Sequence, residues 1–170
     1  MTLTDLDQVL AIQQRCYPPH YREPFSAFEN KLLRSPGTAW LAVDGGDAVG
    51  YLVTLLVDEN HFPALHQADW TPPVQAKWLY LHDLAVVPRQ RGGGAGHGLI
   101  DRARTHARST GLQGLSLVAV QGSQPYWARQ GFQVRDVAHA ALRKKLCSFG
   151  EDACFMVRDD HRGSGFVIGD

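Results

Sequence analysis

The sequence predicts one α/β domain built on a mixed β-sheet. Its 170 residues suit a single domain that buries its own hydrophobic core. Segments with helical and strand-like patterns alternate along the chain, which favours strands joined by crossover helices. Two strand-like runs around Asp44-Gly45-Gly46-Asp47 also predict a β-hairpin. Because hairpins join antiparallel strands and crossover helices join parallel ones, we expect both kinds of pair in the sheet.

The N-terminal half is expected to hold two helices, the hairpin and a third strand. Leu6, Val9 and Leu10 recur at the spacing of one helix face. Pro18 and Pro19 cannot continue that helix, so a turn must follow it. The expected elements are helices at 5–15 and 24–34 and strands at 39–43, 48–57 and 77–87, with a long connection at 58–76.

The C-terminal half alternates helices and strands. Leu99, Ala103 and Ala107 recur every four residues and predict a helix. Glycine inside a helix costs about 1 kcal/mol, so we expect close packing on the sheet to explain Gly98. Residues from about 158 to 170 are polar and glycine-bearing and are expected to form a frayed tail of a domain spanning 1–170. The expected elements are helices at 95–109 and 123–129 and strands at 115–120, 132–134 and 153–157.

The bulk composition excludes several classes of protein. The formal net charge is zero, so no overall field favours nucleic acid or an anionic membrane. Three cysteines without C-x-x-C spacing argue against a disulfide framework. Neither a signal peptide nor a run of about 18 apolar residues is visible, so we expect a cytoplasmic protein. His61, His66 and Asp69 lack the spacing of a metal site, so no metal is expected.

The segment Arg91-Gly92-Gly93-Gly94-Ala95-Gly96 follows a strand and opens a helix. Backbone amides in such a turn and in the first helical turn have no intrahelical partner, and the helix dipole favours an anion there. A P-loop would continue with lysine and a hydroxyl residue, whereas His97 and Gly98 follow here. A dinucleotide site would need an acidic residue at the end of the next strand, and the strand at 115–120 ends without one. The turn therefore predicts a different phosphate-bearing cofactor.

Two motifs in order carry a resemblance to a known family. Arg91-x-x-Gly94-x-Gly96 resembles motif A of the GCN5-related N-acetyltransferases (GNAT), and the segment 125–132, ending in Gly131-Phe132, resembles their motif B. The resemblance covers nearly the whole chain, and residues 81–86 look most similar to the arylalkylamine N-acetyltransferase branch. It implies an α/β/α sandwich with a mostly antiparallel sheet that splays between two middle strands. It also implies that the glycine-rich turn holds the pyrophosphate of acetyl-CoA.

The resemblance also implies which residues bind the cofactor: the splayed strand end, the glycine-rich turn and the motif B helix. Many family members have a tyrosine at the position of Trp127, and its hydroxyl protonates the departing thiolate. An indole N–H is not a usable acid, and neighbouring helical residues point about 100° apart, so Tyr126 cannot simply replace it. We expect the thiolate to leave without a dedicated acid or through water. The expected cofactor-binding residues are Leu84, Ala85, Val86, Arg91, Gly92, Gly93, Gly94, Ala95, Gly96, His97, Tyr126 and Trp127.

Three residues are candidates for the chemistry. His82 has the side chain suited to deprotonating an ammonium, and in arylalkylamine-type enzymes a histidine at this position does so; a core histidine bonded to a neighbour is the alternative. The resemblance implies that a free strand amide, that of Val86, stabilises the oxyanion. Glu23 follows the Pro-Pro turn and could bind an ammonium or assist as base, with a first-turn helix glutamate as the alternative.

Strand alternation adds an expectation about the faces of the third strand. It places Tyr80, His82, Leu84 and Val86 on one face and Asp83 on the other. A carboxylate in a central strand is costly unless it is paired, so we expect Asp83 to accept hydrogen bonds from a helix amide or an arginine.

Taken together, these features predict an acetyl-CoA-dependent N-acetyltransferase in which a primary amine attacks the thioester directly. The aromatic and proline content of the connection at 58–76 favours a small, aromatic amine as acceptor. Two alternatives stay open: an acyl-CoA-binding sensor without turnover, which Trp127 motivates, and transfer to a protein or peptide. We expect no nucleic-acid or membrane partner and leave a homodimer open.

Overall fold

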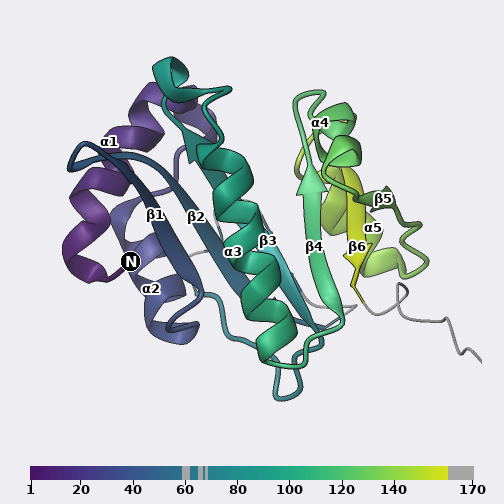
Figure 1. Ribbon diagram of the computed structural model, residues 1–170. Helices are drawn as coiled ribbons and strands as arrows, with labels where there is room; N and C mark the ends of the chain where they lie inside the picture. Colours follow the sequence, from purple (N-terminus) through teal and green to yellow (C-terminus); the bar gives the residue numbers. More distant parts are fainter. Residues whose placement is uncertain (59–61, 65–66, 68, 161–170) are drawn as a thin grey trace, which may run out of the picture.

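The computed structural model describes residues 1–58, 62–64, 67 and 69–160. A six-stranded sheet with the strand order β1-β2-β3-β4-β6-β5 lies at its centre. Helices cover both faces of this sheet and give the molecule three layers (Figure 1). The strands are β1 (Ala39–Asp44), β2 (Asp47–Val57), β3 (Trp78–Val86), β4 (Gly114–Ala119), β5 (Gln133–Val134) and β6 (Cys154–Asp159).

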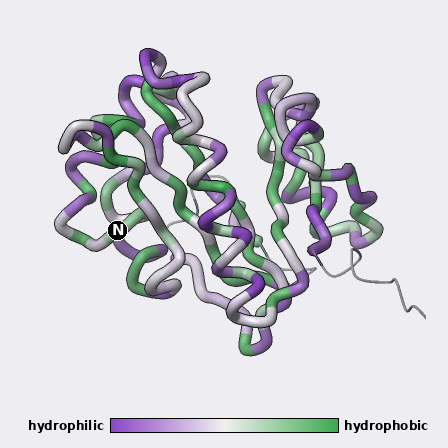
Figure 2. The backbone as a smooth tube through the Cα atoms, viewed as in Figure 1, coloured by the Kyte–Doolittle hydropathy of each residue, from purple (hydrophilic) through white to green (hydrophobic). Residues whose placement is uncertain are grey.

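The helices divide between the two faces according to their apolar stripes. One face is covered by α1 (Leu6–Cys16), α2 (Phe25–Arg34) and α5 (Ala140–Cys147), and the other by α3 (Ala95–Ser109) and α4 (Gln124–Arg129). Hydrophobic backbone segments concentrate in the strands between these layers (Figure 2). Within the described residues, no helix is long and apolar enough to cross a membrane. Three 3-10 turns, η1 (Leu3–Asp5), η2 (Pro19–Tyr21) and η3 (Pro88–Gln90), complete the elements.

The predicted α/β sandwich and its order of elements are confirmed, and α3 has the predicted bounds. One helix, α5, was not predicted. It is short, and Leu142 is its single buried residue, so its periodicity is weak. β6 continues through Asp159, into the expected tail, and residues 161–170 lie outside the described part.

The sheet splays between its two middle strands. β3 and β4 form the one parallel pair of the described sheet, and they are paired only at Trp78, Leu79 and Tyr80 with Gly114, Leu115 and Ser116. Beyond Tyr80 the two strands separate (Figure 1). The backbone groups of β3 that would face β4 therefore have no strand partner along its second half.

β3 contains one extra residue relative to β2, and this residue is His82. Val53 pairs with Asp83 and Thr54 pairs with Leu81, so His82 has no partner in the ladder. Such a bulge shifts the alternation of side chains by one position along the strand. The two halves of β3 therefore present opposite sets of side chains to the same face.

This bulge makes the expected alternation along β3 wrong. Tyr80 and His82 lie on the face covered by α1, α2 and α5, and Asp83 lies there with them. Leu84 and Val86 instead lie on the face of α3. The sequence carries no periodic signal for one inserted residue, because both halves of the strand are strongly apolar.

Two glycines, Gly50 of β2 and Gly98 of α3, differ in the space that is available for a side chain. An added Cβ at Gly50 of β2 would lie 2.8 Å from the Ala85 carbonyl oxygen and 3.1 Å from Cγ2 of Val86. At Gly98 an added Cβ would meet nothing within 4 Å, so the expected close packing of α3 at Gly98 is wrong.

We expect Gly50→Ala to destabilise the fold by about 1–3 kcal/mol, because the new methyl overlaps a backbone carbonyl that cannot move without disturbing the β2–β3 ladder. Gly98→Ala should instead stabilise it by about 1 kcal/mol through helix propensity. Urea unfolding of both variants measures the two free energies. Equal stabilities for the two variants would contradict this account.

Candidate active site

The glycine-rich turn presents a row of backbone amides at the start of α3. Gly92 and Gly94 have φ angles of 85° and 91°, a region that side-chain-bearing residues rarely adopt. Gly94 is the N-cap of α3 and supplies no side chain to satisfy the helix amides. Within the described residues, the amides of Gly92, Gly94, Ala95, Gly96 and His97 have no hydrogen-bond acceptor. Together with the helix dipole they form a site for an anion such as a phosphate.

Arg91 fixes this turn to the end of β3. Its Nε donates to the Val86 carbonyl at 3.1 Å. The thiol of Cys16, at the end of α1, donates to the same carbonyl at 3.4 Å. Arg91 therefore ties the phosphate-type turn to the strand that borders the split.

Two amides of β3 point into the split. The Val87 amide donates to the Val49 carbonyl of β2, so Val87 and Ala85 direct their backbone groups toward β2. Leu84 and Val86 alternate with them and direct their amides toward β4, which is no longer paired there. Three residues at the end of β3 were expected to bind the cofactor. Among the described residues, the amides of Leu84 and Val86 have no strand partner, whereas the amide of Ala85 is directed toward β2.

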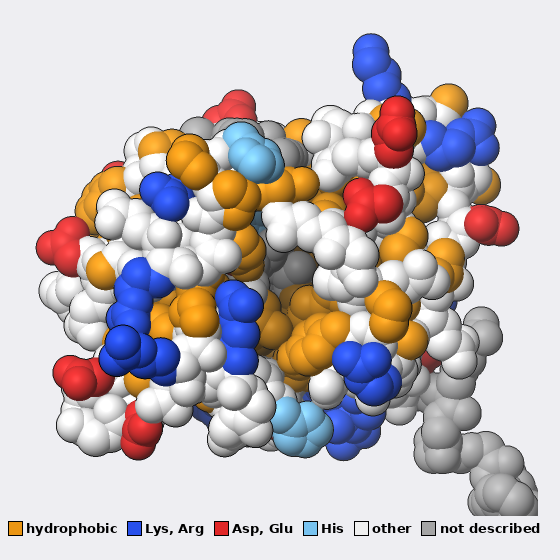
Figure 3. All heavy atoms as spheres, turned by 90° about the horizontal axis from the view of Figure 1, so that it is seen from above, with side chains coloured by type: hydrophobic (Ala, Val, Ile, Leu, Met, Phe, Trp, Pro, Cys, Tyr) orange, Lys and Arg blue, Asp and Glu red, His pale blue; other side chains and the backbone are white. Residues whose placement is uncertain are grey.

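The split is a hollow at the molecular surface. Seen from above, it is lined by hydrophobic side chains, and Lys and Arg side chains stand at its rim (Figure 3). The start of α3 lies at the same end of the sheet as the separated ends of β3 and β4 (Figure 1). A long ligand with a phosphate at one end and a hydrogen-bonding arm could therefore lie along it.

The α4 helix borders the opposite side of this hollow. A Cβ added to Gly96 would lie 3.3 Å from the Tyr126 hydroxyl oxygen and 3.7 Å from Cγ2 of Val86, so this hydroxyl reaches the start of α3. The Trp127 ring packs edge-on against Phe132, with centroids 5.4 Å apart. The two neighbouring aromatic residues thus have different surroundings, and Tyr126 stands beside the turn.

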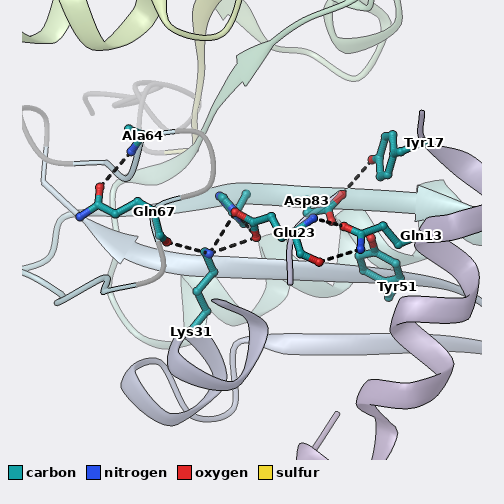
Figure 4. Close-up of polar contacts among 9 residues, drawn as sticks. Gln13, Tyr17, Glu23, Lys31, Tyr51, Ala64, Gln67 and Asp83 are labelled. Carbon is teal, nitrogen blue, oxygen red and sulfur yellow. Dashed lines mark hydrogen bonds and ion pairs between the residues drawn. The ribbon is translucent and has the colours of Figure 1, made fainter. Parts of the chain in front are cut away.

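A buried ionic cluster lies on the other face of the sheet. Nε2 of His82 lies 2.9 Å from Oε2 of Glu23. Nζ of Lys31 lies 3.0 Å from the same oxygen (Figure 4). The Glu23 backbone is fixed by Gln13 of α1, whose side chain accepts from its amide at 2.8 Å and donates to its carbonyl at 3.0 Å. The sequence predicted His82 and Glu23 separately, and the fold brings them into direct contact.

The hydrogen bond to Glu23 defines the chemistry of His82. Burial by itself would raise the pKa of Glu23, but the interactions with His82 and Lys31 outweigh it and lower that pKa from 4.5 to about 2. A carboxylate can only accept, so the Nε2 of His82 donates to it. Within the described residues, Nδ1 of His82 has no hydrogen-bond partner, and in this tautomer it holds a free lone pair.

Asp83 belongs to a separate cluster beside the bulge. Its two carboxylate oxygens accept hydrogen bonds from the hydroxyls of Tyr17 at 2.8 Å and Tyr51 at 2.6 Å. Burial raises the pKa of Asp83, and the two tyrosines partly oppose this rise. The expected structural role is therefore met, but the donors are tyrosines and not a helix amide or an arginine.

Tyr80 fills the base of the split. Its hydroxyl lies beside the backbone of Val118 in β4, beyond the last β3–β4 pair. Its ring stacks on that of Phe62, with centroids 5.5 Å apart. Burial raises the pKa of Tyr80 well above its ordinary value, so this hydroxyl stays protonated.

Described residues of the connection at 58–76 cover the ionic cluster. The Gln67 carbonyl accepts from Nζ of Lys31 at 3.1 Å (Figure 4). Phe62 and Trp70 are buried in the same core cluster as Tyr80. His61 and His66 lie outside the described residues, and within the described ones no group of three potential ligands could hold a metal.

Sequence reasoning missed Lys31, although the pattern of α2 contained a signal. Lys31 stands three residues after Phe28 and next to Leu32, on the face of the helix that is buried. A lysine on an apolar stripe predicts a buried ion pair. Tyr17 and Tyr51 left no comparable signal, because the bulge that turns Asp83 toward them is not visible in the sequence.

Comparisons with known proteins agree with this geometry. The model of the acetyltransferase (GNAT) family matches residues 6–132. The loading GNATL domain of CurA from Lyngbya majuscula superposes with a TM-score of 0.77 at 11% identity, over 95% of this chain and 96% of that one. The GphF GNAT-like decarboxylase, solved with isobutyryl-CoA, gives 0.74 at 15% identity, over 94% and 96%.

A third neighbour is the ribosomal-protein-S18-alanine N-acetyltransferase from Escherichia coli. It superposes with a TM-score of 0.64 at 15% identity, over 94% of this chain and 90% of that one. At these identities the likeness shows the fold. No curated protein sequence matches the chain.

The Glu23 cluster predicts a specific pH dependence of stability. The pKa of Glu23 is lower in the folded protein, so its contribution is complete above about pH 4.5 and is lost as the pH falls toward 2. A shift of this size corresponds to about 3 kcal/mol. We expect Glu23→Gln to lose less stability than the unmodified protein between pH 6 and pH 3 in urea unfolding. The control is Glu151→Gln at an exposed position, and matching slopes for all three proteins would refute the assignment.

Proposed function

The chain belongs to the GNAT acetyltransferase family, and from this we propose that it transfers an acetyl group from acetyl-CoA to a primary amine. The observation that carries the proposal is the row of amides without an acceptor among the described residues, at Gly92 and at 94–97, which lies at the end of a hollow bordered by two β3 amides without a strand partner. These groups fit the two polar parts of coenzyme A. The turn suits a pyrophosphate, and the strand amides suit an amide-containing arm.

The oxyanion donor is the strand amide nearest to the base. Acetyl-CoA supplies an activated thioester whose carbonyl oxygen gains negative charge on attack. Leu84 lies two residues from His82, about 7 Å along a strand, and Val86 lies four residues away. The Leu84 amide is therefore the better placed to hydrogen-bond this oxygen, and Val86 stays a candidate for binding the arm.

His82 acts as general base in this proposal. The carboxylate of Glu23 holds Nε2–H, and Nδ1 accepts the proton of the attacking amine directly or through water. The Tyr126 hydroxyl is near the phosphate-type turn and serves binding, so the thiolate leaves through water. A thiol with a pKa near 8.5 is a tolerable leaving group near neutral pH.

The acceptor is a small amine in this proposal. Gln67, Phe62 and Trp70 cover the base, which disfavours a long peptide lying across His82. One structural neighbour acts on the alanine of a ribosomal protein, so a peptide acceptor belongs in the test.

A second candidate is decarboxylation of an acyl-CoA with a carboxylate on the carbon next to the thioester. One neighbour is a GNAT-like decarboxylase. The covered, buried His82 suits a reaction that needs no second substrate. Loss of carbon dioxide leaves an enolate, which the same strand amides can stabilise until a proton reaches the carbon.

One experiment separates these activities. The protein is incubated with acetyl-CoA and a panel of small amines and peptides while free thiol is measured, and with a carboxyacyl-CoA while the mass of the acyl-CoA is followed. Amine-dependent thiol release supports the proposal. Loss of carbon dioxide without thiol release supports the second candidate, and tight binding without either product indicates a sensor.

Gly94→Glu should abolish binding of coenzyme A in calorimetry. The substitution forces a side chain into a φ of 91° and places a carboxylate beside the phosphates. Gly111→Glu is the matched control, because Gly111 has a φ of 73° and lies beyond the opposite end of α3, outside the site. Retained affinity in Gly94→Glu would sink the assignment of the turn.

His82→Ala should slow acetyl transfer by about 100-fold at pH 6 and by much less at pH 9. Free amine is scarce at low pH, where a base is needed, and abundant at high pH. The rate ratio of unmodified protein to variant is measured across this range, with His106→Ala on α3 as the control. A ratio that does not change with pH would remove His82 from the proton transfer.

A further inference from the structure

Lys31 is a charged side chain with almost no access to water. It is 1% exposed, although lysine is rarely buried without a partner. Its ammonium group donates to Oε1 and Oε2 of Glu23 at 3.1 and 3.0 Å and to the Gln67 carbonyl at 3.1 Å. These three bonds use all three N–H groups and hold Nζ in one place.

Lys31 and His82 share one carboxylate oxygen. Oε2 of Glu23 lies 3.0 Å from Nζ of Lys31 (Figure 4). The same oxygen lies 2.9 Å from Nε2 of His82. The other ionisable groups near His82 are Asp83, which two tyrosine hydroxyls hold, and Tyr80, whose ring centroid is 6.1 Å away. The charge of Lys31 is thus the one positive charge among the described groups facing this histidine.

We propose that Lys31 is a positioning residue that offsets the charge of Glu23 and so leaves Nδ1 of His82 free to accept a proton. An isolated carboxylate next to a histidine stabilises the imidazolium form. The ammonium on the same carboxylate cancels most of that charge and leaves the hydrogen bond to Nε2 in place. Glu23 then orients the ring and fixes its tautomer without trapping a proton on Nδ1.

This inference rests on the proposed role of His82 as base, but its direct test needs no turnover. The titration of the His82 ring is followed by NMR in the full chain, with His82→Ala used to identify its signals. We expect Lys31→Met to raise the midpoint by about one pH unit or more, because the carboxylate is no longer neutralised. Glu23→Gln should lower the midpoint, because it leaves the positive charge without its partner.

The two variants are expected to shift the midpoint of the His82 titration in opposite directions, which distinguishes this role from a purely structural one. Lys144→Met, which removes an exposed lysine of α5, is the control and should leave the midpoint unchanged. If folded Lys31→Met keeps the midpoint of the unmodified protein, the proposal is overturned. If Lys31→Met does not fold, Glu23→Gln is the remaining test. An unchanged or raised midpoint of the His82 titration in that variant overturns the proposal.

Kinetics give a second, separable readout. In the acetyl-transfer assay the acidic limb of the pH–rate profile should move with the midpoint in each variant, and the rate of Lys31→Met should recover at high pH. A rate that is low at every pH, with an unshifted midpoint, overturns the proposal. Absence of transfer with every acceptor refutes the proposed function, whereas the midpoint shifts continue to decide the role of Lys31.

Discussion

The separation of β3 and β4 after Tyr80 is the constraint on which the rest of this protein depends. A strand inside a sheet normally satisfies its backbone groups on both sides, and an unpaired buried amide costs free energy. Here the amides of Leu84 and Val86 have no strand partner among the described residues, whereas their carbonyls accept hydrogen bonds from Tyr17 and Arg91. Side chains of the protein thus donate hydrogen bonds to the free carbonyls of β3, and the free amides of β3 remain available to a ligand.

The two faces of the splayed strand carry different parts of the site. On the side of α3 lie the phosphate-type turn and the hydrophobic hollow, and on the side of α1 and α2 lie the ionic groups. The ionic groups are buried, yet each charge is paired: Glu23 with Lys31, and Asp83 with two hydroxyls. A rigid cluster of this kind holds the histidine in one orientation, which a surface histidine could not match.

Much of the fold and the cofactor end of the site could be predicted from the sequence, because both depend on local patterns. Helix stripes, the hairpin glycines and the motif at Arg91–Gly96 each act over a few residues. The contact between Glu23 and His82 spans 59 positions and depends on how α2 packs on the sheet, so the sequence indicated both residues but not their pairing. The faces of β3 were mispredicted for a different reason. One inserted residue exchanges the faces of the side chains that follow it, and the apolar pattern of the strand does not show the insertion.

The bulge makes His82 an insertion in an otherwise regular ladder, because Thr54 and Val53 of β2 pair with Leu81 and Asp83 on either side of it. Substitution removes the imidazole but keeps the extra residue, so Leu84 and Val86 retain their orientation. Removal of the whole residue would join Leu81 to Asp83 and close the gap in the ladder, with Asp83 still on the side of Tyr17 and Leu84 still on the side of α3. A one-residue insertion or deletion between Asp83 and Val86 would instead turn the end of the strand over, so the spacing there is under stricter constraint than the presence of the bulge.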